Sequence, residues 1–283
     1  MQRKSVEEFR PLPGKAAPFE GPCRWLIALD YDGTLRQSHG NPPVSEAFFE
    51  LMRQWRPLGV RWGINTGRSL RYLCDDLLPC SPCLPDFICT FERFAYVAGE
   101  DGTVAPVREH NQPAHEANMK LRMSMAPLLR EWMERICREH PQLRWEFAER
   151  DPLSVEARDA EMMERIAPLL EPLVQRHAGV AMQRAGRFMR LSDARYNKGT
   201  ALACVADRWQ LPPERICMAG DGHNDLDAFR SFPAAFRAVP GNAHPQVAAE
   251  LRRMGGYCSP AEGVMELLHH WFGTVVEPTV PPA

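Results

Sequence analysis

The chain has 283 residues, of which 45% are hydrophobic and 25% charged, and its formal net charge is −2. This composition is ordinary for a globular protein, and the near-neutral charge gives no general attraction for nucleic acid or an anionic membrane. No apolar stretch is long enough for a signal peptide or a membrane-spanning helix. We therefore expect a cytoplasmic protein without a nucleic-acid or membrane partner.

The first predicted strand opens the stretch around which we expect the fold to be organised. It follows a proline-punctuated extension, residues 1–22, and lies in Trp25–Leu35, WLIALDYDGTL. The apolar run predicts a buried parallel strand that becomes a loop at Gly33. Asp30 and Asp32 follow the strand, where open α/β sheets bind ligands, and residues two apart in an extended chain point the same way. Both carboxylates can then face one ligand; the alternative is two aspartates in a surface turn.

The elements that follow alternate between helices and strands, which predicts an α/β fold with a doubly wound, Rossmann-like parallel sheet as its core. A β-hairpin closes this first part of the core, residues 23–107. The expected elements are helix 45–56, strand 60–65, helix 69–78, strand 86–90 and the hairpin strands 96–98 and 103–107.

Residues 108–192 follow a different pattern, a helix and two strands made twice, which predicts an inserted α+β cap domain. Its expected elements are helix 115–139, strands 143–149 and 153–158, helix 159–177, and strands 180–183 and 187–192. The first pattern resumes over residues 193–273, with helix 197–209, strand 215–219, a helix to 230, strand 235–239 and helices 245–253 and 261–272. The proline-rich residues 274–283 are expected to be a disordered tail.

Further polar clusters are predicted at the same edge of the core sheet as Asp30 and Asp32. Thr66 offers a hydroxyl, and Gly67 lets the backbone approach an anion. Asp221 and Asp225 follow a later strand and would converge with the first two carboxylates. Four carboxylates in one place require a cation, and hard oxygen ligands favour Mg²⁺. Lys198, one of only four lysines, supplies a compact positive charge.

These motifs resemble the haloacid dehalogenase superfamily of phosphatases. They are Asp30-x-Asp32-Gly33-Thr34, Thr66-Gly67-Arg68, Asn197-Lys198-Gly199 and Gly220-Asp221-Gly222-x-Asn224-Asp225. The cap resembles the sugar-phosphatase subclass of that superfamily. The stretches 239–243 and 261–264 are similar to sucrose-phosphate phosphatases, and the cap stretch 151–158 is similar to trehalose-phosphate phosphatases. His223 occupies a motif position for which the resemblance implies no role.

The resemblance implies a Mg²⁺-dependent phosphatase that works through an aspartyl-phosphate. Asp30 is then the nucleophile, and Asp32 is the general acid and base, which must start protonated and which neighbouring carboxylates would keep so. The metal ligands implied are Asp30, the Asp32 carbonyl, Asp221 and Asp225. Thr66 and Lys198 would hold the phosphoryl oxygens, and the substrate-binding residues would be Thr66, Gly67, Arg68 and Asn224.

The cap suggests the class of substrate, because a cap that closes over the phosphate limits access to small molecules. We expect a sugar or polyol phosphate such as sucrose phosphate. Trehalose phosphate or a phosphoglycerate derivative is the alternative within the class. Polar residues of the cap strands could contact it, namely Arg144, Glu146, Glu156 and Arg190. Two alternative hypotheses concern other classes of protein. One is a receiver-like protein phosphorylated on aspartate, which would need no such cap, and the other is a catalytically silent binding protein.

Nine cysteines, scattered through the predicted elements, suit reduced thiols. Four of them cluster in the sequence, Cys74, Cys80, Cys83 and Cys89, with Cys80-Ser-Pro-Cys83 as the centre. A structural zinc site would normally need a second such pair or two histidines. We expect ordinary loop and core cysteines, with zinc or redox chemistry as the alternative.

Overall fold

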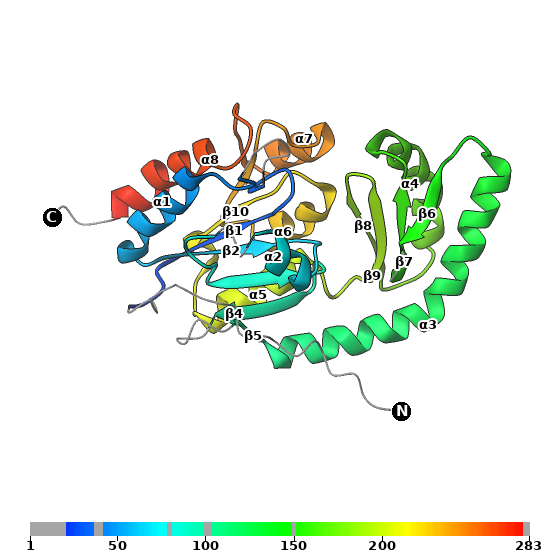
Figure 1. Cartoon of the computed structure of the whole chain (residues 1–283), viewed down its shortest axis with the longest axis horizontal. Helices are drawn as coiled ribbons and strands as arrows, with labels where there is room; N and C mark the ends of the chain where they lie inside the picture. The colour runs from blue at the N-terminus through cyan, green and yellow to red at the C-terminus, as the bar shows by residue number, and fades with distance from the viewer. Residues whose placement is uncertain (1–20, 37–41, 78–80, 99–103, 149–150, 280–283) are drawn as a thin grey trace.

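The computed structural model describes residues 21–36, 42–77, 81–98, 104–148 and 151–279, which form two β-sheets with helices packed against them (Figure 1). The larger sheet has eight strands in the order β12-β11-β10-β1-β2-β3-β4-β5. The smaller one has four strands in the order β6-β7-β9-β8. Most of the predicted extension and the hairpin loop 99–103 lie outside the described residues.

The strand β1 (Trp25–Leu29) lies in the middle of the larger sheet, and all five of its residues are buried. It pairs in parallel with β10 (Ile216–Ala219) on one side and with β2 (Val60–Asn65) on the other. Parallel pairing continues outward to β11 (Phe236–Val239) and to β3 (Phe87–Thr90). The carboxyl ends of these strands therefore meet at one edge of the sheet, as the sequence predicted.

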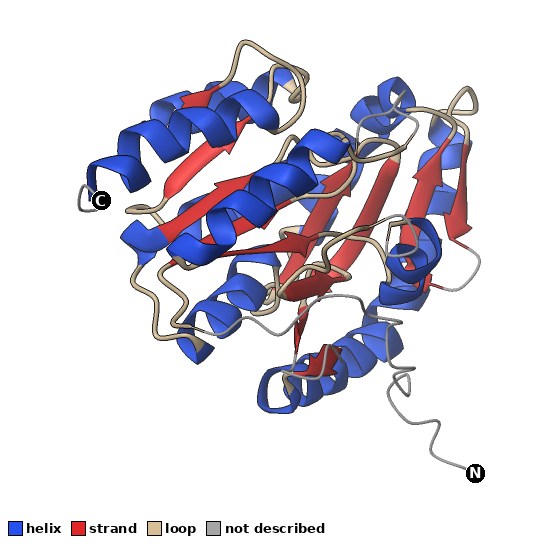
Figure 2. Ribbon diagram, turned by 60° about the vertical axis from the view of Figure 1, so that its left-hand side comes forward, coloured by secondary structure: helices blue, strands red, loops and turns tan. Residues whose placement is uncertain are grey.

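Helices cover both faces of the larger sheet, which confirms the doubly wound fold (Figure 2). One face packs against α1 (Glu46–Trp55), α2 (Leu70–Asp76) and α8 (Met265–Trp271). The other packs against α5 (Lys198–Arg208), α6 (Leu226–Ser231) and α7 (Pro245–Arg253). Because β1 and β10 are buried on both faces, their sequences are continuously apolar rather than alternating.

The edges of the larger sheet differ in how well the sequence predicted them. The hairpin is present as β4 (Phe94–Ala98) and β5 (Val104–Pro106), and β4 pairs antiparallel with both β3 and β5. At the other edge lies β12 (Tyr257–Cys258), which we did not predict. Its two residues are too few to produce a periodic pattern.

The four-stranded sheet is antiparallel and belongs to the predicted cap. Its elements are α3 (Arg108–Glu139), β6 (Trp145–Ala148), β7 (Asp151–Ala157), α4 (Ala160–Val174), β8 (Val180–Ala185) and β9 (Phe188–Asp193). Alternate strand residues such as Val155 and Leu191 pack against α3 and α4. The opposite face carries Ser154, Gln183 and Arg190, which are neighbours in the strand register. The helix-strand-strand unit is thus made twice, with its helices on one face.

Helix α3 begins at Arg108, seven residues before the predicted start at 115. The buried side chain of Asn111 explains the difference, because it bonds to both the N–H and the carbonyl of Ala95, at 2.8 Å each, and fixes the first turn on β4. Pro113 lies inside the helix as its sixth residue and cannot donate a backbone hydrogen bond to Glu109, a loss that the contacts of Asn111 help to offset. The exact limits of the cap and core domains stay a prediction.

The predicted disordered tail is wrong for residues 274–279. A π-helical turn over Phe272–Val276 and a 3₁₀ turn over Glu277–Thr279 extend α8. Phe272 stacks on Trp55 with ring centroids 4.3 Å apart, and Val276 is buried in the core. Burial of these apolar side chains stabilises the segment despite its proline content. Among the described residues, no helix is both long and apolar enough to cross a membrane.

Candidate active site

The loop after β1 places Asp30 at the carboxyl edge of the sheet. The Asp30 N–H bonds to the Ala219 carbonyl at 2.9 Å, which keeps this residue between β1 and β10, and its side chain is buried. Gly33 has φ +76°, and a Cβ atom there would lie 2.3 Å from an Asp221 carboxylate oxygen. Only glycine therefore allows the loop to pass this close to Asp221.

Lys198 is the first residue of α5, and its fully buried side chain joins two of the carboxylates. Asn197 caps the helix through a reciprocal pair of hydrogen bonds with Thr200. Lys198 Nζ donates to Asp30 Oδ1 and to Asp225 Oδ1, at 2.7 Å each. Burial alone would lower the pKa of Lys198, but the two carboxylates outweigh it and raise the pKa above its ordinary value. The lysine is therefore a permanent cation inside the site.

Asp221 and Asp225 are brought beside Asp30 by the loop after β10. Asp221 Oδ1 accepts a hydrogen bond from the Thr34 hydroxyl at 3.0 Å, and Asp225 Oδ2 accepts one from the Gly222 N–H at 2.9 Å. One carboxylate oxygen of each of Asp30, Asp221 and Asp225 lies within 4.8 Å of the others. Three of the four predicted carboxylates are thus together.

These carboxylates suit a divalent cation by their chemistry. Burial raises the pKa of Asp30 well above its ordinary value, with Lys198 opposing and Asp225 and Asp221 adding to the effect. Burial and the charge of Asp225 also raise the pKa of Asp221 to about 6. A bound cation would relieve both costs, and an all-oxygen donor set matches Mg²⁺. Asp30, Asp221 and Asp225 fit as its ligands, and the role of the Asp32 carbonyl stays a prediction.

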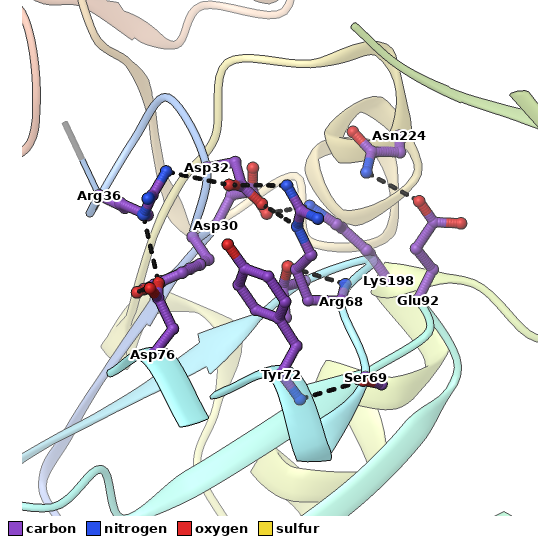
Figure 3. Close-up of polar contacts among 12 residues, drawn as sticks. Asp30, Asp32, Arg36, Arg68, Ser69, Tyr72, Asp76, Glu92, Lys198 and Asn224 are labelled. Carbon is purple, nitrogen blue, oxygen red and sulfur yellow. Dashed lines mark hydrogen bonds and ion pairs between the residues drawn. The ribbon is translucent and has the colours of Figure 1, made fainter. Parts of the chain in front are cut away.

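Asp32 lies apart from this cluster and is paired with arginines (Figure 3). Arg68 Nε donates to Asp32 Oδ2 at 2.7 Å, and Arg68 Nη2 donates to Asp32 Oδ1 at 3.2 Å. Arg36 lies 4.0 Å from the same carboxylate. We expected neighbouring carboxylates to keep Asp32 protonated. The structure instead places the guanidinium of Arg68 against this carboxylate in a two-pronged pair.

Thr66 and Gly67 form the turn between β2 and α2. The buried Thr66 hydroxyl accepts a hydrogen bond from the Arg68 N–H at 3.1 Å. A Cβ atom at Gly67 would lie 3.1 Å from Glu92 Oε1. The preceding residue, Asn65, donates from Nδ2 to the Lys198 carbonyl at 3.0 Å. These contacts hold the end of β2 against the start of α5, so the second and third motifs are adjacent.

Glu92 is a site residue that the sequence analysis missed. Asn224 Nδ2 donates to Glu92 Oε1 at 2.8 Å, and both side chains are buried (Figure 3). Glu92 has φ +65°, an uncommon conformation for a residue other than glycine. It follows β3, whose carboxyl end lies at the same edge as those of β1 and β2. The rule that located Asp30 and Thr66 could therefore have located Glu92.

Asn242 is a second missed residue, in a segment that we had compared with sucrose-phosphate phosphatases. Its Nδ2 donates to the Gly33 carbonyl at 2.6 Å, and its Oδ1 accepts from the Gly263 N–H at 3.2 Å. The two stretches near the end of the chain thus brace the loop that carries Asp30 and Asp32.

The open face of the cap sheet is turned toward the core. Gln183 Nε2 donates to Asp227 Oδ2 of α6 at 2.9 Å. The Arg190 guanidinium carbon lies 5.4 Å from the ring centroid of Phe91, a residue of the core loop after β3. Arg190 Nε also donates to Asp151 Oδ2 at 2.9 Å. Of the four predicted cap residues, Arg190 is therefore the one that the structure places against the core.

The other three predicted cap residues make contacts within the cap. Glu156 pairs with Arg187 at 2.6 Å and lies opposite Glu146 in the strand register. Arg144 donates to the carbonyls of Pro141 and Leu143. A role for these three residues in substrate binding stays a prediction.

The clustered cysteines do not form one site within the described residues, from which Cys80 is absent. Cys83 is buried in the cluster on one face of the larger sheet, against which Cys74 packs, whereas Cys89 is buried on the other face. Burial raises the pKa of Cys83 to about 11, so its thiol is protonated and a poor metal ligand.

Comparison with known proteins supports the resemblance. Residues 154–272 match the sucrose-6F-phosphate phosphohydrolase family. A phosphoglycolate phosphatase from Methanothermobacter thermautotrophicus is 33% identical over 91 residues, which are 31% of this chain. The match spans only 38% of the length of that relative.

Solved structures match a larger part of the chain. The sucrose-phosphatase from Synechocystis sp. PCC6803, solved with sucrose and phosphate, has a TM-score of 0.64 and 18% identity, over 88% of this chain and 97% of that one. A phosphatase of the haloalkanoate superfamily from Bacteroides thetaiotaomicron has a TM-score of 0.55 and 20% identity, over 87% and 94%. At such identities the likeness establishes the fold. With the family match, it confirms the resemblance to haloacid dehalogenase superfamily phosphatases and to sucrose-phosphate phosphatase among them.

Proposed function

We propose that this chain, which has the haloacid dehalogenase fold, is a Mg²⁺-dependent phosphatase that hydrolyses a small phosphomonoester. The observation that carries the proposal is the buried pair of hydrogen bonds from Lys198 to Asp30 and Asp225, with Asp221 beside them. Burying such a charged group is costly and is characteristic of functional sites. A protein that needed only this fold would gain no stability from keeping these buried charges.

The proposed reaction has two steps. Asp30 attacks phosphorus, the bond to the leaving oxygen breaks, and Asp32 gives that oxygen a proton. A water molecule then attacks the aspartyl-phosphate while Asp32 takes its proton, which releases phosphate and restores Asp30. Lys198 neutralises charge on the phosphoryl oxygens throughout. Mg²⁺ held by Asp30, Asp221 and Asp225 would neutralise further charge there.

In this proposal the pair between Arg68 and Asp32 separates during the reaction. Asp32 can give a proton only when it is protonated, and in the structure both of its carboxylate oxygens accept hydrogen bonds from Arg68. An anionic or hydroxyl-rich substrate can take over the donors of Arg68 and release Asp32. Substrate binding would thereby prepare the acid, and Arg68 would be a substrate-binding residue as the sequence predicted.

The cap supports a small substrate. Its open face contacts the core through Gln183 and Arg190, so the cap lies against the core. Two similar proteins are described as a sucrose-phosphatase and a phosphoglycolate phosphatase, and both names denote small phosphate esters. We propose a sugar or polyol phosphate as the substrate, with trehalose phosphate or a phosphoglycerate derivative as the alternative. A cytoplasmic location stays a prediction.

A substrate screen tests the proposal. Sucrose phosphate, trehalose phosphate, phosphoglycolate and a phosphopeptide are compared at equal concentration with Mg²⁺ and with chelator, and Asp30→Asn is the control for contaminating phosphatases. We expect Mg²⁺-dependent phosphate release that is fastest for a small ester. A higher kcat/KM for the phosphopeptide would refute the argument from the cap. A stable phosphoprotein without turnover would favour a receiver-like protein. If neither phosphate release nor a phosphoprotein is detected, the result would favour a silent binding protein.

A further inference from the structure

A second group of potential metal ligands lies where the cap meets the core, and it shares no residue with the aspartate cluster. It consists of Glu164 on α4 of the cap, His223 in the loop after β10, and His244 just before α7. One ligand atom of each residue lies within 4.8 Å of the others, and all three residues are half-buried. In Figure 1, α4 and α7 lie at the facing sides of the cap and the core.

The contacts of these residues hold them in place. The His244 N–H donates to the Asp221 carbonyl at 3.0 Å, and its ring Nε2 lies 3.6 Å from Glu164 Oε1. The rings of His223 and His244 are tilted against each other with centroids 4.3 Å apart. Each element thus presents its side chain to the same small volume.

The hydrogen bonds of the histidines indicate which nitrogens could bind a metal. His223 Nε2 lies 3.1 Å from Gln246 Oε1, which can only accept, so this nitrogen carries the proton and Nδ1 keeps its lone pair. In metal sites, a histidine that binds the metal through one ring nitrogen usually donates a hydrogen bond from the other nitrogen. In His244, Nδ1 accepts a long bond from the Gln246 N–H at 3.3 Å. Metal binding through Nε2 of His244 would move its proton to Nδ1 and replace that contact.

Arg184 is the group that opposes a cation here. It forms an ion pair with Glu164 Oε1, the oxygen that also faces His244. A carboxylate has about four lone-pair positions on its two oxygens, so Glu164 can accept a hydrogen bond from Arg184 and bind a metal ion at the same time. The guanidinium then acts as an outer partner that orients the carboxylate, at the cost of some repulsion.

We propose that Glu164, His223 and His244 bind one divalent ion of the zinc class, and that this ion ties the cap to the core. Two imidazoles and a carboxylate form a donor set that zinc accepts, with water able to complete four-coordination. Mg²⁺ prefers oxygen ligands and is expected to bind at the aspartates. This assignment gives a role to His223 and is independent of the proposed phosphatase activity.

Metal binding tests the proposal without reference to turnover. Tag-free full-length protein is saturated with Mg²⁺, and Zn²⁺ binding is measured by titration against a chromophoric chelator. We expect one Zn²⁺ per chain, with zinc–nitrogen distances of about 2.0–2.1 Å by X-ray absorption. Glu164→Gln and His244→Ala should each weaken this binding at least about 10-fold.

Matched variants keep the test specific. Glu161 lies on the exposed side of the same helix, and His115 is an exposed histidine of α3; Glu161→Gln and His115→Ala should bind Zn²⁺ like the wild type. Asp30→Asn should also retain the zinc, which separates this site from the aspartate cluster. Absence of one bound equivalent, or equal binding by the double variant Glu164→Gln/His244→Ala, would overturn the proposal.

Discussion

Arg68 holds the carboxylate of Asp32 by two hydrogen bonds, Nε to Oδ2 at 2.7 Å and Nη2 to Oδ1 at 3.2 Å. The same guanidinium lies over the ring of Tyr72, with its carbon 4.4 Å from the ring centroid. Arg68 is thus positioned from both sides before any substrate arrives. Asp32, the proposed general acid, is therefore held in place by Arg68, the residue proposed to bind the substrate.

Replacing Arg68 tests this relationship. Arg68→Met should lower kcat/KM about 10–100-fold, because hydrogen bonds to charged groups contribute about 1.5–3 kcal/mol. Steady-state kinetics with the best substrate of the screen measures the effect. Arg71→Met, on the exposed side of α2, is the control and should be unchanged. Equal kinetics of the two variants would show that Arg68 serves only to hold Asp32.

Asp30→Asn should abolish hydrolysis and leave the fold intact. The substitution preserves the side-chain volume, and the amide oxygen can still accept from Lys198 Nζ. Phosphate release is compared with circular dichroism and thermal unfolding of the same sample. Residual hydrolysis above about 1% of the wild type would contradict a covalent role, since loss of a nucleophile usually costs orders of magnitude.

Lys198→Met should destabilise the protein as well as inactivate it. Asp30 and Asp225 would then be buried without their cation, and breaking a buried ion pair on one side costs about 3–5 kcal/mol. Urea unfolding in chelator measures the loss, with Lys120→Met on the exposed surface of α3 as the control. A loss no larger than that of the control would mean that the carboxylates are not charged in the folded protein.

The stability of the metal-free protein should fall as pH rises from about 4 to about 6. The pKa of Asp221 is raised from 3.8 to about 6 in the folded state, so over this range the folded protein binds more protons at Asp221 than the unfolded chain. Asp221→Asn should remove up to one proton from the measured slope. The exposed Asp75→Asn is the control. If the wild type and Asp221→Asn have the same slope in chelator, the raised pKa is wrong.

Cys80 and Cys83 should be dispensable for activity. Cys83 and Cys89 lie on opposite faces of the larger sheet and cannot share a metal ion. Kinetics of the Cys80→Ser/Cys83→Ser variant should match the wild type. Stoichiometric zinc in the purified protein that disappears in this variant would contradict the prediction.

The sequence predicted the convergence of Asp30, Lys198, Asp221 and Asp225 because each lies at or near one end of an element whose place in a doubly wound fold is known. Strand ends are fixed by topology, and topology follows from the order of elements. The partner of Asp32 was not predictable in this way. Its pairing depends on the direction of one long side chain, which no sequence period specifies.

Contacts between the cap and the core could not be predicted from the sequence, for a related reason. Glu164, His223 and His244 come from three segments with no common spacing, and only the docking of the cap brings them together. The early start of α3 was missed because it depends on one long-range contact, from Asn111 to Ala95. Apolar periodicity describes what a helix packs against, not where a single polar side chain fixes its end.

Helix α3 has a mechanical consequence for the cap. Its 32 residues extend about 48 Å along a helix axis that bends between the core and the cap (Figure 1). Asn111 clamps one end to the core sheet, while Leu129 and Met133 are packed into the cap. A tilt of about 10° at the clamp would move the far end by up to about 8 Å, the value for a straight helix. Pro113 lies between Asn111 and Leu121, the first residue of α3 that packs into the cap, and it cannot donate a backbone hydrogen bond, which weakens the helix there. The reach of the cap is thus governed by a helix that supplies no predicted catalytic residue.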